Sequence, residues 1–121
     1  MKKRTLILGA SPNPERYAYK VTLMLSEKGH NVFPVGLRKG MIDTHEILLD
    51  NPIIENIDTV TLYVGPKNQP EHYDYILQKI KPKRIIFNPG TENDELIALA
   101  QKNGIETEVA CTLVLLSLNS Y

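Results

Sequence analysis

Short apolar runs alternate with amphipathic segments along the whole chain. Five of these runs are rich in β-branched or aliphatic residues and are bounded by glycine, proline or polar residues, which is typical of buried strands. The predicted strands cover residues 5–8, 32–35, 57–64, 84–87 and 105–109. Pro34 lies inside the second run and removes a backbone donor, so we expect that strand to be short or irregular there.

The segments between the strands show helical spacing of their apolar residues. The predicted helices cover residues 17–28, 69–80, 92–102 and 111–118. Gly29 follows the first helix at the position where a helix end favours glycine. The last helix is apolar, and we expect it to cover one face of the sheet. Residues 38–56 have the weakest pattern, and Thr44 followed by residues 46–49 predicts one short helical turn.

Strands separated by helices of about a dozen residues pair in parallel through crossover connections. The alternation therefore predicts an α/β chain with a three-layer Rossmann-like fold, whose five-stranded parallel sheet has the order 3-2-1-4-5. In that order, successive strands are added on one side of the first strand and then, from the fourth strand on, on its other side. The switch point of the sheet therefore lies between the first and the fourth strand. A ligand is expected there, where residues 9–16 and 88–91 meet. The length favours a single domain over residues 1–121.

Charge and cysteine content narrow the class of protein. Lys and Arg number 14, as do Asp and Glu, so the net charge is zero and we expect no nucleic-acid partner. No apolar run reaches the ~20 residues of a membrane span, and the run behind the basic N-terminus is too short for a signal peptide. Cys111 is the only cysteine, which favours a reducing, cytoplasmic compartment.

The loop after the first strand is the strongest candidate for ligand binding. Gly9 permits a tight turn, and the small Ala10 and Ser11 let backbone N–H groups approach a diphosphate near the positive end of the next helix. Ala18 is small enough for close contact between helix and strand. The full Gly-x-Gly-x-x-Gly pattern is absent, so a tight turn that binds nothing is the alternative.

The end of the second strand indicates the kind of ligand. NAD-binding sheets usually place Asp or Glu there to hold the ribose hydroxyls. This chain has the basic pair Arg38-Lys39 instead, which suits a phosphate on the ribose, as in coenzyme A or NADP. The alternative is a solvated basic loop.

Catalytic and metal-binding patterns are not found. His30, His45 and His72 lack the spacing of metal ligands, so we expect no metal site. The neighbours of Cys111 are apolar, which favours a buried packing residue over a reactive thiol. No nucleophile, base and orienting group can be assembled from spacing, so no catalytic residue is predicted.

Several segments resemble one family. The run ILGASPNPERYAYKV (residues 7–21) closely resembles the opening of small stand-alone CoA-binding domain proteins, which are relatives of the N-terminal domain of the succinyl-CoA synthetase alpha subunit. Residues 32–35, the run FNPGTEN (residues 87–93) and Cys111 are also similar to that family. Departures are Gly36-Leu37 in place of Asn-Pro, Ala18 in place of glycine, and Val109-Ala110 in place of Asp-Arg.

The resemblance implies a set of ligand contacts. The diphosphate would lie at Gly9, Ala10, Ser11, Arg16 and Tyr17. The adenosine and its 3′-phosphate would lie at Gly36, Leu37, Arg38 and Lys39. The turn after the third strand corresponds to Val64, Gly65 and Pro66, and the loop after the fourth strand to Asn88, Pro89 and Gly90.

We therefore expect a protein without catalytic activity that binds coenzyme A or an acyl-CoA through the diphosphate loop. Its expected partner is this small-molecule nucleotide, and a protein partner or homo-oligomer stays open. One alternative is a small NADP-binding reductase, in which Tyr17, Tyr63 or a lysine would donate the proton. Another is a nucleotide-sensing interaction module that docks through apolar residues 113–118.

Overall fold

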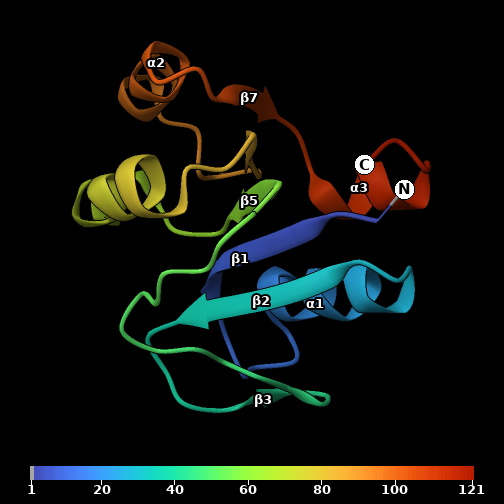
Figure 1. The fold of residues 1–121 in the computed structure, drawn as a ribbon. Coiled ribbons are helices and arrows are strands. Elements are labelled where there is room, and N and C mark those ends of the chain that lie inside the picture. Colours follow the sequence, from blue (N-terminus) through green and yellow to red (C-terminus); the bar gives the residue numbers. More distant parts are fainter. Residues whose placement is uncertain (1) are drawn as a thin grey trace.

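The computed structural model describes residues 2–121 and contains a parallel sheet between two layers of helices (Figure 1). The sheet has five strands in the order β2-β1-β5-β6-β7, and a separate two-stranded sheet pairs β3 with β4. The main strands are β1 (Arg4–Ala10), β2 (Asn31–Gly36), β5 (Thr59–Leu62), β6 (Arg84–Phe87) and β7 (Glu106–Val109). The predicted α/β, Rossmann-like class is confirmed.

The predicted strand order was wrong at one position. The third long strand, β5, pairs with β1 in the register Leu6 to Val60 and not with β2. In the numbering of the predicted strands the order is 2-1-3-4-5 instead of 3-2-1-4-5. All four residues of β5 are buried, which suits a central position, whereas β2 is half-buried and forms the edge.

Pro34 explains why β2 lies at the edge of the five-stranded sheet. Its carbonyl accepts a 2.8 Å hydrogen bond from the Leu48 N–H, on the side of β2 that faces away from β1. The N–H and C=O of one strand residue point to the same side, so the donor missing from proline falls on the outer edge. The reversal of strand order consequently lies between β1 and β5, and the loop after β5 opposes the Gly9 loop.

Helices cover both faces of the sheet. α1 (Tyr17–Glu27) and α3 (Thr112–Ser117) lie together on one face, and α2 (Asp94–Lys102) lies on the other (Figure 1). Successive residues of β1 alternate between the two cores, as the period of a strand requires. Ile7 packs in the cluster of α1 and α3, whereas Leu6 and Leu8 pack in the cluster that contains Leu96 of α2.

The predicted helix at 69–80 is present in an irregular form. It consists of two 3₁₀ turns, η1 (Pro66–Asn68) and η2 (Pro70–His72), followed by a π-helix, η3 (Tyr75–Ile80). Lys81 ends it with a positive φ of 50°, and its N–H donates to the Ile76 carbonyl over 3.0 Å. The apolar stripe of η3 is buried against the sheet.

The predicted helical turn near Thr44 was wrong. The segment instead forms an antiparallel hairpin of β3 (Met41–Ile42) and β4 (His45–Glu46). Ile42 and Ile47 are buried in the cluster of α1, and the Leu48 backbone pairs with the outer edge of β2. An extended chain here allows Ile42 and Ile47 to be buried and the Leu48 backbone to pair with β2. A helical turn would allow neither.

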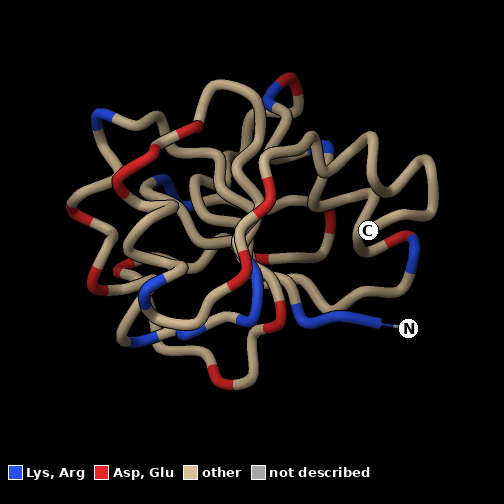
Figure 2. Tube along the Cα trace, turned by 90° about the horizontal axis from the view of Figure 1, so that it is seen from above, with Lys and Arg blue, Asp and Glu red and all other residues tan. Residues whose placement is uncertain are grey.

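The surface carries both signs of charge in a mixed pattern. Acidic and basic residues are interspersed around the trace (Figure 2), consistent with the zero net charge. Within residues 2–121, no helix is both long and apolar enough to cross a membrane.

Candidate functional site

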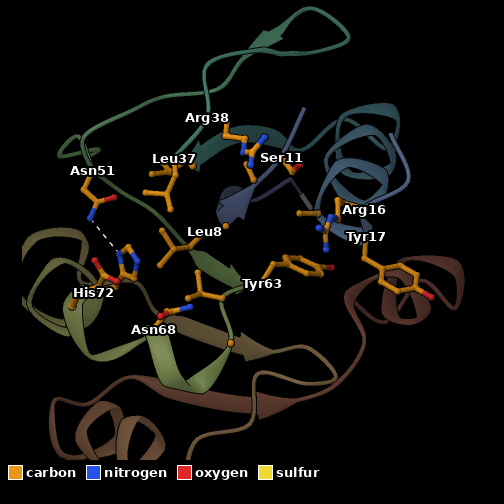
Figure 3. A pocket seen from close by; sticks show the side chains of 18 residues that line it. Leu8, Ser11, Arg16, Tyr17, Leu37, Arg38, Asn51, Tyr63, Asn68 and His72 are labelled. Atoms are coloured by element: carbon orange, nitrogen blue, oxygen red, sulfur yellow. Dashed lines mark hydrogen bonds between the residues drawn. The ribbon is translucent and has the colours of Figure 1, made fainter. Parts of the chain in front are cut away.

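A cleft of about 620 Å³ opens at the carboxyl ends of β2, β1 and β5, at the point where the strand order reverses. The β1–α1 loop, the end of β2 and the turn after β5 contribute its walls, together with Asn51 and the start of the irregular helix. Figure 3 shows Arg16 and Tyr17 at one end, Asn51 and His72 at the other, and Leu8 between them. Ligands of open α/β sheets bind at such a place.

Two glycines allow the three strand ends to approach closely. Gly9 has a φ of 97°, and a Cβ there would lie 2.8 Å from the Tyr63 carbonyl oxygen. A Cβ on Gly36 would lie 2.3 Å from the Ala10 carbonyl oxygen. Neither position has space for a side chain, so the backbone itself forms the cleft wall.

The positive end of α1 is open toward the cleft. Arg16 is the N-cap residue with extended backbone, yet its side chain caps nothing, and the first turn contains no acidic residue. The preceding loop is stabilised internally, because the Asn13 N–H donates to Ser11 Oγ over 3.1 Å and the Glu15 N–H to Asn13 Oδ1 over 3.0 Å. Backbone donors and the helix dipole are thus left to attract an anion.

The structure brings most of the predicted site residues together. Lining the cleft are Gly9, Ala10, Ser11, Arg16, Tyr17, Gly36, Leu37, Arg38, Val64 and Gly65. Arg16 and Arg38 are exposed cations that approach the cleft from α1 and from β2. Leu37 is 89% exposed, so an apolar surface stands open beside them.

The remaining predicted residues do not line the cleft: Lys39, Pro66, Asn88, Pro89 and Gly90. Asn88 is buried, and its amide is fully engaged. Its Nδ2 donates to Thr61 Oγ1 over 2.8 Å and to the Leu62 carbonyl over 2.9 Å, while its Oδ1 accepts from Thr112 N–H and Oγ1. Asn88 therefore connects β6 to β5 and α3. The predicted strand order placed the loop after β6 opposite the Gly9 loop, but in the structure the loop after β5 lies there.

Several cleft residues have no signature in the sequence: Asn51, Asn68, Glu71 and His72. Tyr63, named from the sequence only as a possible proton donor of a reductase, also lines the cleft. The Asn51 Nδ2 lies 3.3 Å from the His72 Nδ1 across the far end of the cleft (Figure 3). The two are 21 positions apart in the chain, and no local pattern links them.

Tyr63 forms part of the cleft wall and is a weak acid there. Burial raises the pKa of its phenol far above the usual range, although a hydrogen bond with Thr61 opposes the shift. The hydroxyl therefore keeps its proton at physiological pH.

Cys111 is only partly buried, which corrects the expectation of a buried residue. It precedes α3 and does not line the cleft. Over the described part of the chain, no three His, Cys, Asp or Glu side chains gather where they could hold a metal ion.

The sheet, the open helix end and the cleft at the strand reversal define a Rossmann-like α/β protein. The sequence pattern of the CoA-binding domain family matches residues 3–117. The chain therefore belongs to the CoA-binding domain family.

Solved structures support the fold. A crystal structure described as that of an uncharacterized protein is 50% identical with a TM-score of 0.97, and the match covers 100% of this chain and 99% of that chain. A hypothetical protein from Pyrococcus horikoshii OT3 is 30% identical with a TM-score of 0.79, covering 93% and 80%. A Thermus thermophilus structure at 22% identity and TM-score 0.84, covering 99% and 91%, shows the fold alone. No curated protein matches the sequence.

Proposed function

We propose that this protein binds coenzyme A or an acyl-CoA, with the diphosphate at the loop Gly9-Ala10-Ser11 and the start of α1. The observation that carries the proposal is the uncapped positive end of α1, which meets the cleft in a chain of the CoA-binding domain family. A diphosphate is the group best stabilised by free backbone donors and a helix dipole. Ser11 Oγ accepts from the Asn13 N–H, so its own hydroxyl hydrogen is left to donate to a phosphate oxygen.

The second cation supports a ligand with a further phosphate. Arg38 follows β2 and lines the cleft, where an NAD-binding sheet would place a carboxylate. A guanidinium at that position suits the 3′-phosphate of CoA. Lys39, which does not line the cleft, is left out of the site in this proposal.

We further propose that the protein holds its ligand without catalysing a reaction. A reductase with NADP would need a proton donor beside the nicotinamide. Two phenols line the cleft, Tyr17, which is 67% exposed, and the more buried Tyr63. Because burial raises the pKa of Tyr63, this phenol gives up its proton reluctantly. An interaction module is supported less, since α3 buries Leu116 against α1 and leaves only Val114 and Leu118 largely exposed.

The test is a comparison of four ligands by isothermal titration calorimetry: CoA, dephospho-CoA, NADP and NAD. The proposal expects CoA to bind most tightly, dephospho-CoA more weakly and NAD weakest. Tighter binding of NADP than of CoA would favour the reductase. Equal affinities for CoA and NAD would contradict a site built around the ribose phosphate.

A further inference from the structure

The end of the cleft remote from α1 holds a polar corner whose function the diphosphate site does not explain. Asn51 and His72 line it and come from two separate segments of the chain, and Glu71, which also lines the cleft, directly precedes His72. Figure 3 shows Asn51 and His72 across the cleft from Arg16 and Tyr17. We call these three residues the base corner.

His72 is the buried member of the base corner. His72 is only 7% exposed, and it lines the cleft. Its Nδ1 lies 3.3 Å from the Asn51 Nδ2, and an amide nitrogen can only donate. Nδ1 therefore accepts, and the neutral ring carries its proton on Nε2.

The Nε2–H group is free to bind a ligand. Among the side-chain hydrogen bonds of residues 2–121 none involves it, and it is not one of the fully buried atoms without a partner. A buried imidazole with one nitrogen held by the protein and the other open to a cleft is an oriented donor.

The backbone presents Asn51 to this histidine. Asp50 and Asn51 both have positive φ values, 62° and 45°, and Pro52 follows them. The Tyr75 hydroxyl donates to the Pro52 carbonyl over 2.6 Å and anchors this bend to η3. This anchored bend therefore fixes the position of the Asn51 side-chain amide at the cleft.

Apolar side chains also line the cleft, and Figure 3 shows Leu8 between the base corner and the α1 end. These apolar residues are Leu8, Val35, Leu37 and Val64. A flat aromatic ring can lie against such surfaces, and its polar edge would then reach the corner.

The donors and acceptors of the corner match adenine. Its exocyclic amine can donate to the Glu71 carboxylate or the Asn51 Oδ1, and a ring nitrogen beside it can accept from the His72 Nε2–H. Hypoxanthine presents a carbonyl oxygen in place of that amine. A carbonyl facing a carboxylate leaves both acceptors without a donor.

We infer that Asn51 and His72, with Glu71, form a nucleobase-reading subsite that selects adenine over hypoxanthine. The inference rests on the proposed function, because it takes the phosphates to lie at the α1 end. It assigns the specificity for the base to residues that share no motif with the diphosphate loop.

The test is an NMR titration of the ¹⁵N-labelled protein with ADP and with IDP. This method also measures weak affinities. Wild type should bind ADP about tenfold more tightly than IDP, the effect of one or two hydrogen bonds. His72→Phe keeps a ring of similar size and removes both nitrogens. Asn51→Gly removes the amide and relieves the positive φ. Each variant should reduce the ratio to within about twofold, since one corner contact is lost.

His45→Ala is the matched control. His45 bonds to Ser26 at 3.0 Å and does not line the cleft, so its removal should leave the ratio unchanged. Equal binding of ADP and IDP by wild type, or a ratio unaltered in both corner variants, would overturn the inference. CoA is titrated in parallel. If CoA fails to bind while the ADP preference persists, the proposed function fails and the base corner stands.

Discussion

In the proposed function, Arg38 is the residue by which the cleft would distinguish ligands that carry a ribose phosphate. It lines the cleft, whereas its neighbour Lys39 does not, although the sequence presents them as one basic pair. A charge-assisted contact with the 3′-phosphate is worth ~1.5–3 kcal/mol, which corresponds to a factor of roughly ten to a hundred in affinity.

Arg38→Ala should therefore abolish the preference for CoA over dephospho-CoA. Lys39→Ala is the matched control and should retain most of it, since the side chain lies outside the cleft lining. Calorimetric titration of both variants with both ligands gives the comparison. A preference that survives Arg38→Ala would mean that this arginine belongs to a solvated loop.

Gly9 tests the same cleft through its backbone. A Cβ there meets the Tyr63 carbonyl at 2.8 Å, and the φ of 97° is unfavourable for any branched residue. Gly9→Val should therefore abolish CoA binding and also lower the free energy of unfolding, by roughly 1–3 kcal/mol. Urea unfolding confirms that the variant folds, and calorimetry measures its affinity. A folded variant with unaltered affinity would move the ligand away from this loop.

At the scale of the element, α1 leaves its N-terminus uncapped at a cost in stability. An acidic or small polar N-cap commonly stabilises a helix by ~1 kcal/mol over a residue that cannot cap. Arg16 has the extended backbone of an N-cap without its side-chain hydrogen bond. An open helix end that also faces a cleft is consistent with a place reserved for an anionic ligand.

Arg16→Asp should raise the stability of the free protein and weaken CoA binding at the same time. The carboxylate would cap α1 by about 1 kcal/mol and repel the diphosphate. Arg16→Ala separates the two effects, since it removes the cation without adding a cap. Denaturant unfolding and calorimetry report stability and affinity. If Arg16→Asp binds CoA as tightly as wild type, the helix end is not the phosphate site.

At the scale of the whole molecule, a ligand that binds only the folded state links affinity to stability. At a free concentration a hundred times its dissociation constant it stabilises by ~2.7 kcal/mol. For a chain of this length that amounts to roughly 10 °C in the midpoint of thermal unfolding.

CoA should therefore raise the melting temperature in a concentration-dependent manner, by roughly 10 °C at that excess. Differential scanning fluorimetry over a series of CoA concentrations gives the measurement, with Gly9→Val as the variant that should show no shift. A melting temperature that stays constant up to saturating CoA would contradict binding to the folded protein.

The strands and helices of this chain were largely readable from sequence because their signals are local. β6 occupies the predicted residues 84–87, and α1 begins at the predicted Tyr17. The period of apolar residues in each segment reflects one buried face, and that face is determined within a few neighbouring residues. The loop that we propose to bind the diphosphate, and Arg38, were predicted in the same way, as residues that directly follow a strand.

The order of the strands and the far half of the cleft were decided by tertiary structure. Whether β5 pairs with β1 or with β2 depends on which strand edge, distant in sequence, binds it more favourably. The local sequence feature that bears on this choice is the backbone N–H that Pro34 lacks on the outer side of β2. That order set which loop faces Gly9, and it turned Asn88 into a buried tie between strands. Asn51 and His72 meet only after the chain has folded, because no local pattern spans the 21 positions between them. The sequence by itself determined the elements and the end of the cleft where we propose that the phosphates bind, whereas packing between distant segments decided the remainder of the cleft.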